Sequence, residues 1–265
     1  MSTPRALDGR VAIVTGSTQG LGLDLVRSLA AAGSHVVLHG LADEARMRDE
    51  CHAVAREHGV RAAFSGADLR TRAGVERLLA TAVEELGDCD VLVNNAVVRY
   101  TGLVEDFSAD AWEESMAVNL SAAFHAISLA VPSMKRRGWG RIVNVSSIYG
   151  LIGAPGRVGY VTAKTALIGL TRAVALETLQ HGITCNAVCP GTVETPVHAA
   201  AIAAAAAAND TTPEEAARRF LAGKQPTGRF IDGAGVAALV TFLCGPGGAD
   251  ITGAALPVDG AWSVS

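Results

Sequence analysis

Short apolar runs recur along the chain and alternate with longer segments whose apolar positions have helical spacing. The runs are rich in β-branched residues and lack a polar alternation, which is typical of strands that are buried on both faces of a parallel sheet. In the longer segments, apolar residues lie three or four positions apart, as they do in amphipathic helices. The pattern therefore predicts an α/β protein in which strands and helices alternate along the chain.

The expected fold is a single-domain, doubly wound (Rossmann) parallel sheet of about seven strands that spans residues 1–265 and is flanked by helices. The expected strands are 10–15, 35–39, 61–65, 91–93, 141–145, 183–188 and 255–258. The expected helices are one that follows the glycine-rich segment 16–22 and ends near Ala32, then 44–58, 72–86, 111–135, one that begins near Val158, 197–208 and 233–243.

The alternation is interrupted after the sixth expected strand. An alanine-rich helix candidate at 197–208 is followed by Thr212-Pro213-Glu214-Glu215, which combines an N-cap, a proline at the first helical position and a capping-box glutamate. We expect residues 195–225 to form a small helical lid over a substrate. A surface excursion without a function is the alternative.

Composition narrows the possible partners. The formal net charge is −4, and the tight basic run Lys135-Arg136-Arg137 lies at the end of an expected helix, where cations complement the helix dipole. We therefore expect no nucleic acid partner. The first ten residues have no apolar segment, and no run approaches the roughly 18 apolar residues of a membrane span, so we expect a cytoplasmic protein that does not bind membranes.

The five cysteines are an odd number without the spacing of a disulfide framework, which indicates free thiols in a reducing compartment. Cys185 and Cys189 flank three residues of an expected strand, and no histidine lies near them in the sequence. We interpret both as core cysteines and expect no metal site.

A glycine-rich turn joins the first expected strand to the first expected helix. Gly16, Gly20 and Gly22 follow Thr15 with the spacing G-x-x-x-G-x-G. A helix N-terminus with free amides favours an anion, so a dinucleotide diphosphate is expected there. The alternative is a tight glycine turn that binds nothing.

The second expected strand ends in Gly40-Leu41, where NAD sites often have an acidic residue and NADP sites a basic one. Because this chain has neither, and because Gln19 stands in the glycine loop, nothing is evident that would hold a 2′-phosphate. We expect NAD rather than NADP. Asp68, at a strand end, could accept a hydrogen bond from the adenine amino group or cap the next helix.

Asparagines follow or interrupt several apolar segments. We interpret Asn94 and Asn95, at the end of the fourth expected strand, mainly as braces for free backbone groups. Asn119 lies among apolar residues in an expected helix, and a buried asparagine needs partners. It could satisfy backbone groups, or it could hold a water that links Lys164 to solvent.

Candidate acid/base chemistry is concentrated in residues 141–164. The apolar strand 141–145 delivers Ser146 and Ser147 to the carboxyl end of the sheet, and Tyr160 and Lys164 lie one turn apart on the next helix. A free tyrosine has a pKa of about 10, and an adjacent ammonium would lower it by favouring the phenolate. Ser147 could then donate a hydrogen bond to a substrate oxygen. This spacing alone is common by chance, and a packed tyrosine beside a solvated lysine is the alternative.

In combination, these motifs resemble the short-chain dehydrogenase/reductase family over residues 9–262. The likeness rests on motifs that occur in the family's order and spacing: Thr15-Gly16-x-x-x-Gly20-x-Gly22, Asn94-Asn95-Ala96, Asn119, Ser147 thirteen residues before Tyr160, Lys164 and Pro190-Gly191. The resemblance implies that the chain is an NAD(P)-dependent enzyme acting on a secondary alcohol or ketone, and that it forms a homotetramer partly through its long helices.

The resemblance also implies roles for four catalytic residues. Tyr160 is the proton donor or acceptor at the substrate oxygen, and Ser147 positions that oxygen. Lys164 lowers the pKa of Tyr160 and binds the nicotinamide ribose, while Asn119 holds a relay water. Hydride would move directly between the nicotinamide and the carbinol carbon.

The cofactor residues follow from the same resemblance, with Thr195 and the Val193 backbone at the carboxamide. The expected set is Gly16, Thr18, Gln19, Gly20, Leu21, Gly22, Leu41, Asp68, Leu69, Asn95, Ala96, Tyr160, Lys164, Pro190, Gly191, Val193 and Thr195. Val97 stands where the family usually has glycine, and its Cβ could weaken or shift cofactor binding.

Within the family, the chain is most similar to bacterial 3-hydroxybutyrate dehydrogenases, which use NAD. The likeness lies in segments 38–43, 66–69, 104–107, 175–177 and 224–226. Their substrate residues glutamine, histidine, lysine, tryptophan and glutamine are replaced here by Arg99, Tyr149, Arg157, Thr192 and Ala201.

These replacements favour a different substrate at a site formed by Arg99, Ser147, Tyr149, Arg157, Tyr160 and Thr192. Two arginines suit a carboxylate or sulfonate, and the small residues leave room. We therefore expect a larger or anionic hydroxy compound, unless the arginines face solvent or a subunit contact. The alternatives are an NADPH-dependent 3-oxoacyl-type ketoreductase and a non-catalytic dinucleotide-binding sensor.

Overall fold

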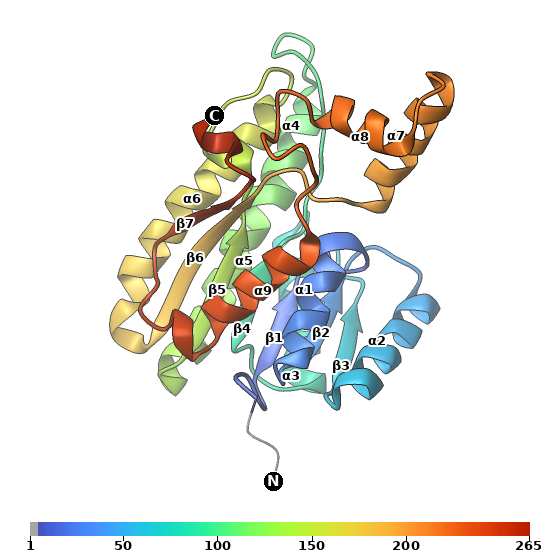
Figure 1. The fold of residues 1–265 in the computed structure, drawn as a ribbon. Coiled ribbons are helices and arrows are strands. Elements are labelled where there is room, and N and C mark those ends of the chain that lie inside the picture. Colours follow the sequence, from blue (N-terminus) through green and yellow to red (C-terminus); the bar gives the residue numbers. More distant parts are fainter. Residues whose placement is uncertain (1–4) are drawn as a thin grey trace.

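The protein is described by a computed structural model that covers residues 5–265, and its centre is one parallel sheet of seven strands (Figure 1). The strand order is β3-β2-β1-β4-β5-β6-β7. The strands are β1 (Val11–Val14), β2 (His35–His39), β3 (Ala62–Ser65), β4 (Val91–Asn94), β5 (Gly140–Val145), β6 (Ile183–Pro190) and β7 (Ala255–Val258). The predicted number and type of strands are confirmed, and the bounds differ by one or two residues.

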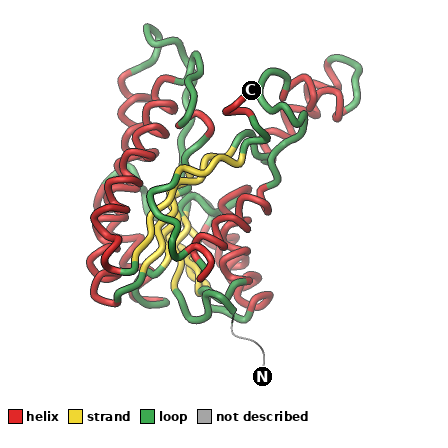
Figure 2. The backbone as a smooth tube through the Cα atoms, turned by 60° about the vertical axis from the view of Figure 1, so that its left-hand side comes forward, coloured by secondary structure: helices red, strands yellow, loops and turns green. Residues whose placement is uncertain are grey.

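Helices cover both faces of the sheet (Figure 2). One core lies under α1 (Gly20–Ala31), α2 (Glu44–His58) and α9 (Gly233–Cys244). The other lies under α3 (Arg72–Glu85), α5 (Ala122–Arg137) and α6 (Val158–Thr178). In β1, Ala12 and Val14 belong to the first core and Val11 and Ile13 to the second, because successive strand residues face opposite sides. Burial on both sides explains why the strands read as continuous apolar runs.

The strand order reverses direction between β1 and β4. From β1 the chain first adds β2 and β3 on one side, and then returns to add β4 to β7 on the other. In doubly wound sheets, such a reversal opens a crevice at the carboxyl ends of the strands, where ligands bind. The glycine turn after β1 and the asparagines after β4 therefore meet at this crevice.

The long helix after β4 differs from the prediction in two ways. It begins as α4 (Ala109–Met116), two residues before the predicted start, because the Ser108 hydroxyl accepts a hydrogen bond from Ala111 N at 3.2 Å. It also contains a π-helical turn, Ala117–Ser121, before α5. No feature of the sequence indicated this turn. Such turns occur frequently at functional sites.

Taken together, Ala109–Arg137 is long and apolar enough to cross a membrane by length and composition alone. The prediction that no segment approaches this requirement is therefore wrong in this respect. The buried face of α5 is part of the second core, where it packs against α3. A core helix satisfies the same length and composition criteria as a membrane span.

The segment after β6 forms a helical hairpin that projects from the body of the molecule (Figure 1). Its helices are α7 (Pro196–Ala208) and α8 (Pro213–Leu221), which pack together through Ile202, Ala206 and Ala216. Thr195 caps α7, and the Thr212 hydroxyl accepts from Glu215 N at 3.2 Å, as the capping motif predicted. The predicted helical excursion is thus present.

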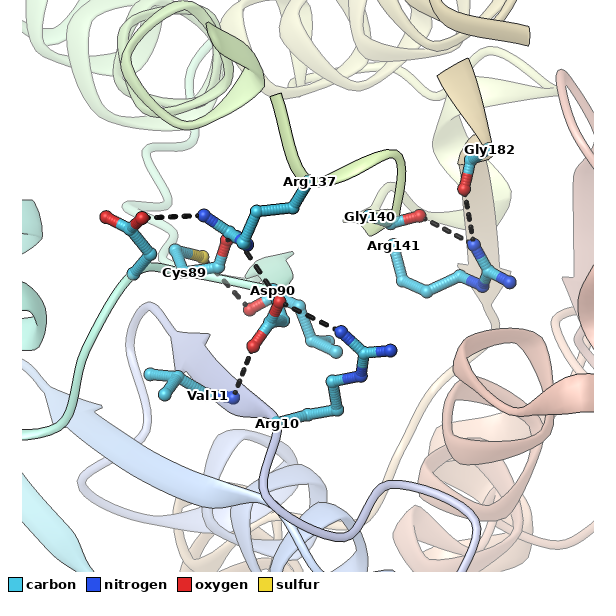
Figure 3. Close-up of polar contacts among 10 residues, drawn as sticks. Arg10, Val11, Cys89, Asp90, Arg137, Gly140, Arg141 and Gly182 are labelled. Carbon is cyan, nitrogen blue, oxygen red and sulfur yellow. Dashed lines mark hydrogen bonds and ion pairs between the residues drawn. The ribbon is translucent and has the colours of Figure 1, made fainter. Parts of the chain in front are cut away.

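The opposite, amino-terminal end of the sheet is held by a carboxylate (Figure 3). Asp90 is buried and accepts hydrogen bonds from Val11 N at 3.0 Å, Arg10 Nη1 at 3.3 Å and Arg137 Nη2 at 3.2 Å. These contacts join the starts of β1 and β4 to the end of α5. Arg141 is also buried here and donates to the Gly140 carbonyl oxygen at 2.8 Å.

Candidate active site

A cavity of about 760 Å³ opens at the carboxyl ends of the strands, along the crevice predicted by the strand order. Its volume is in the range typical of cofactor and substrate sites. Of the residues predicted for the cofactor and substrate, all line this cavity. Asn119, predicted as catalytic, instead lines a small neighbouring cavity together with Lys164.

The glycine turn is packed tightly against the end of β4. Gly16 has a φ of +64°, and a Cβ there would lie 2.7 Å from the Cα of Ala96. A Cβ on Gly22 would lie 2.1 Å from the Gly16 carbonyl oxygen. Both positions therefore require glycine for steric reasons.

Asn95 and Thr15 hold this glycine turn in place through hydrogen bonds with the backbone. Asn95 Nδ2 donates to the carbonyl oxygens of Thr15 and Gly16, both at 2.9 Å. The Thr15 hydroxyl accepts from the Asn95 and Ala96 amides, also at 2.9 Å. Asn94 Nδ2 donates to Asn144 Oδ1 at 2.8 Å. The asparagines after β4 thus brace the sheet and the turn, as predicted.

His39 also positions the glycine turn, and the sequence analysis missed it. The side chain is buried, its Nδ1 accepts from Gly16 N at 3.1 Å, and its Nε2 lies 2.8 Å from the Ala67 carbonyl oxygen. Burial lowers the pKa of His39, so the ring is neutral and Nε2 donates. A histidine at a strand end has no local sequence feature that would reveal this contact.

The residues that follow the carboxyl ends of β2 and β3 form one wall of the cavity. Leu41 is 71% exposed and lines the cavity beside Gly40. Asp68 lines it too, and its carboxylate accepts from Arg70 Nε at 2.9 Å. The interpretation of Asp68 as a cap for the next helix is wrong, because Thr71 caps α3 and accepts from Gly74 N at 3.1 Å.

The two serines after β5 have different environments. The Ser146 hydroxyl donates to the Lys164 carbonyl oxygen at 2.7 Å and therefore ties β5 to α6. The Ser147 hydroxyl accepts from Tyr149 N at 3.2 Å within a 3₁₀ turn, Ile148–Gly150, and both serines line the cavity. The structure thus assigns a bracing contact to Ser146, whereas the Ser147 hydroxyl faces the cavity beside Tyr160.

Tyr160 and Lys164 are buried in the first turns of α6, with 9% and 2% of their surfaces exposed. Lys164 Nζ donates to the Val145 carbonyl oxygen at 2.7 Å and lies 5.7 Å from the centre of the Tyr160 ring. Burial by itself raises the pKa of Tyr160, but the charges of Lys164 and Arg99 and a hydrogen bond with Ser147 outweigh it, so the pKa lies below the ordinary value. Burial lowers the pKa of Lys164.

Arg99 thus contacts the tyrosine itself. Its guanidinium carbon lies 5.7 Å from the centre of the Tyr160 ring, within cation–π range. The sequence analysis assigned Arg99 only to the substrate. Its position in the loop between β4 and α4 gives no local indication of a contact with a residue in α6.

The Asn119 side chain lies in the π turn, and both its oxygen and its nitrogen are bonded to backbone groups. Its Oδ1 accepts from Val98 N at 2.8 Å, and its Nδ2 donates to Val98 O at 3.0 Å. The expected satisfaction of backbone groups is therefore present. The neighbouring cavity, of about 10 Å³, is bordered by Asn119, Lys164, Thr15 and Asn94 and is about the size needed for the centre of one water molecule.

The loop after β6 forms another wall. A Cβ on Gly191 would lie 2.6 Å from Gln225 Oε1, and this buried glutamine accepts a hydrogen bond from Thr192 N. His198 Nδ1 lies 2.9 Å from the Val193 carbonyl oxygen. Gln225 therefore fastens the segment that follows α8 to the loop after β6, a contact that the sequence did not indicate.

Aromatic and cationic side chains line the remaining part of the cavity. The Tyr149 ring lies edge to face with Tyr160, at 6.3 Å between centroids, and with Trp262 at 5.4 Å. Arg157 lines this region with Thr192. Ala201 is exposed on α7 and is not among the residues that line the cavity, so position 201 contributes no side chain to the cavity wall. The sequence analysis missed further lining residues: Arg70, Glu114, His198, Phe220, Lys224 and Trp262.

No cluster of three or more potential metal ligands exists among residues 5–265. The five cysteines are buried and free. This arrangement agrees with the interpretation of Cys185 and Cys189 as core residues, and the chemistry of the cavity is that of a phenol, hydroxyls and cations.

Comparison with known proteins gives relatives along the whole chain. A sequence model described as short chain dehydrogenase matches residues 10–206. The chain is 38% identical to a D-beta-hydroxybutyrate dehydrogenase of Cupriavidus necator, over 97% of this chain and 98% of that one. It is 34% identical to a 3-oxoacyl-acyl-carrier-protein reductase of Aquifex aeolicus, over 96% of this chain and 97% of that one.

A solved structure has the same architecture. L-sorbose reductase from Gluconobacter frateurii, complexed with NADPH and L-sorbose, superimposes with a TM-score of 0.93 at 25% identity. The superposition covers 99% of this chain and 100% of the reductase.

Proposed function

Since the chain belongs to the short-chain dehydrogenase family and is an alcohol/ketone oxidoreductase, we propose that it uses NAD(H) and that Tyr160 is its acid/base. One observation carries this proposal. The buried Tyr160–Lys164 pair and the Ser147 hydroxyl line the same cavity as the glycine turn. A reacting carbon between these groups would be in contact with both a proton donor and a cofactor.

The residues of the cavity fit a dinucleotide. The amides at the start of α1 have no side-chain cap at Gln19, which leaves them available to a diphosphate. Side chains are excluded at Gly16 and Gly22, so a ligand can approach the backbone of the turn. Leu41, Asp68 and Leu69 would hold the adenosine end, while Val193 and Thr195 would hold the nicotinamide end. The nicotinamide, when bound, donates or accepts the hydride.

Tyr160 moves the proton in this scheme. In ketone reduction its hydroxyl donates a proton to the carbonyl oxygen, and the Ser147 hydroxyl donates a hydrogen bond to the same oxygen. The fixed charge of Lys164 stabilises the phenolate that results. A water in the small cavity between Asn119 and Lys164 would return a proton to the site. Alcohol oxidation uses the same groups in reverse.

The cofactor preference rests on the charges around Leu41. The β2 end contributes no cation to the lining of this part of the cavity, and Arg70, which follows the neighbouring strand β3, is engaged by Asp68. A 2′-phosphate would therefore lack a free cation, which supports NAD. The alternative, an NADPH-dependent 3-oxoacyl-type ketoreductase, is supported by the reductase relative and by the NADPH-bound structural neighbour. The ratio of kcat/KM for NADH and NADPH distinguishes the two, and NAD dependence requires a ratio well above one.

The substrate we propose is a hydroxy or keto compound larger than 3-hydroxybutyrate, or an anionic one. Thr192 is a small residue in the cavity wall, and Arg99 and Arg157 line the same cavity. Arginine binds carboxylates and sulfonates through planar pairs of hydrogen bonds.

Replacement of Tyr160 by phenylalanine tests the acid/base assignment. Tyr160→Phe keeps the ring and removes the transferable proton, so kcat should fall by at least about a hundredfold. NADH binding, followed by the fluorescence of the reduced cofactor, should stay within about twofold of the wild-type value. Turnover by this variant at the wild-type rate would refute the assignment. Absence of turnover of every alcohol and ketone by the wild-type protein would favour a non-catalytic sensor.

We further propose a homotetramer in the cytoplasm. Large apolar side chains are exposed on two separate parts of the surface, with Phe124 on α5 and Leu176 on α6 in one and Phe242 on α9 in the other. Two different two-fold interfaces are what a tetramer with dihedral symmetry needs. Five free thiols are compatible with a reducing compartment.

A further inference from the structure

Three cations line the cavity on the side of Tyr160 that leads to the lid: Arg99, Arg157 and Lys224. None of the acidic side chains in residues 5–265 lies within 4.0 Å of their nitrogens. The two acidic lining residues are engaged elsewhere: Glu114 is bonded to the Tyr100 hydroxyl and pairs with Arg70, and Asp68 is bonded to Arg70. The protein as a whole carries a formal charge of −4, so uncompensated positive charge in one cavity has no general cause in its composition.

Lys224 is held in place although it belongs to the end of the lid. Its Nζ lies 4.1 Å from the centre of the Phe220 ring, and Phe220 stacks on Phe230 with 6.0 Å between centroids. The adjacent Gln225 is buried and bonded to Thr192 at the end of β6. A lysine fixed at both its backbone and its stem loses little conformational freedom when it binds a ligand.

Arg157 and Lys224 line the same cavity and come from different elements. Arg157 precedes α6, and Lys224 follows α8. Burial and the charge of Arg157 lower the pKa of Lys224, which means that the two cations are close enough to repel each other. An anion between them would remove this repulsion and bind both.

Aromatic side chains form the cavity wall between Tyr160 and the cations Arg157 and Lys224. Tyr149 contacts Tyr160 on one side and Trp262 on the other, and the charge of Arg157 acts on its hydroxyl. Starting from Tyr160, the cavity wall therefore runs through aromatic rings to the two cations. A ligand that follows this wall is apolar in its middle and anionic at its far end.

We propose that Arg157 and Lys224 together bind an anionic group at the substrate end remote from the reacting carbon, so that the substrate is a hydroxy or keto acid with an apolar spacer along Tyr149 and Trp262. This proposal rests on the proposed function, because it places the reacting carbon at Tyr160. It makes Lys224, a lid residue, a determinant of substrate specificity.

The test uses pairs of ketones that differ only in charge: levulinate and methyl levulinate, and para-acetylbenzoate and its methyl ester. For the wild-type protein, kcat/KM should be at least about tenfold higher for each acid than for its ester, and higher for para-acetylbenzoate than for the shorter acetoacetate. In Lys224→Met, which keeps the length of the side chain and removes its charge, the acid-to-ester ratio should fall about tenfold through KM. Lys224→Arg should retain most of the ratio.

Arg218→Met is the matched control, because Arg218 is an exposed cation on α8 outside the cavity. It should leave the acid-to-ester ratio within about twofold of the wild-type value. The dissociation constant of NADH, measured by fluorescence for each variant, should also be unchanged, since an equal loss in Lys224→Met would show that the lysine serves the cofactor.

The outcomes separate the two proposals. If the esters are reduced as fast as the acids, or if Lys224→Met affects both equally, the anion site is refuted while the dehydrogenase function stands. If neither acids, esters nor neutral ketones are reduced by the wild-type protein, the proposed function itself fails.

Discussion

Arg99 shows how one side chain can take part in both chemistry and binding. Its guanidinium lies over the Tyr160 ring, and it shares with Lys164 the task of opposing the effect of burial on the phenol. A partly exposed cation at this distance contributes on the order of 1 kcal/mol, because solvent screens it. Lys164, which is fully enclosed by protein, acts from a less polar environment and should contribute more.

Removal of the Arg99 charge should therefore change the pH dependence of the reaction. Alcohol oxidation needs the phenolate, and the pKa of Tyr160 is held down partly by Arg99, so Arg99→Met should raise that pKa. For alcohol oxidation, the rising limb of the plot of kcat/KM against pH should then shift to higher pH by roughly half a unit to one unit. Arg99→Lys should restore most of the wild-type profile. A profile that stays in place in Arg99→Met while only KM changes would limit Arg99 to substrate binding.

The contact between the 3₁₀ turn Ile148–Gly150 and α6 determines where Ser147 stands relative to Tyr160. Gly150 lies where a Cβ would be 2.4 Å from Ser146 Oγ and 2.7 Å from the Lys164 carbonyl oxygen. Real Cβ atoms do not approach backbone oxygens so closely, so the two elements can meet only at a glycine. The hydrogen bond from Ser146 to Lys164 O closes the same contact.

A pair of glycine-to-alanine substitutions tests this contact. Gly150→Ala should push the turn away from α6, lower the free energy of unfolding by about 1–3 kcal/mol and reduce kcat by at least about tenfold. Gly153→Ala, in the exposed loop before α6 with nothing within 4 Å of the added Cβ, should instead change the free energy of unfolding by less than about 0.5 kcal/mol and leave kcat unchanged. Denaturant unfolding and steady-state kinetics measure both effects. Equal behaviour of the two variants would contradict the proposed geometry.

The arrangement of exposed apolar residues predicts how whole molecules associate. Leu176 is 74% exposed on α6 and Phe124 is 51% exposed on α5, which is unusual for large side chains of a free surface helix. Light scattering on the purified protein should give the mass of four chains of 27.1 kDa each. Leu176→Glu, which places a charge in that patch, should give dimers or monomers, and Val83→Glu, an equally apolar position on α3, should leave the tetramer intact. A monomeric wild-type protein would rule out the assembly.

At the level of the whole chain, the alternation of strands and helices and the family could both be predicted from the amino-acid sequence. These features are local: the apolar period reports burial of a strand or of one helix face, and the glycine spacing, the caps at Thr212 and the Tyr160–Lys164 spacing are all set within a few residues. The helical excursion after β6 was predicted from the same kind of signal. Strand order and the position of the crevice then agreed with the connectivity rules of doubly wound sheets.

The side-chain contacts between different helices, strands and loops could be found only in the tertiary structure. Asn119 pairs with Val98, His39 holds the glycine turn, Arg99 reaches Tyr160 and Lys224 faces Arg157. Each of these contacts joins residues from different elements, and no period or motif in either segment encodes the distance between them. The reason is physical: local patterns determine which side of an element is buried, but packing of the elements determines what lies on that side.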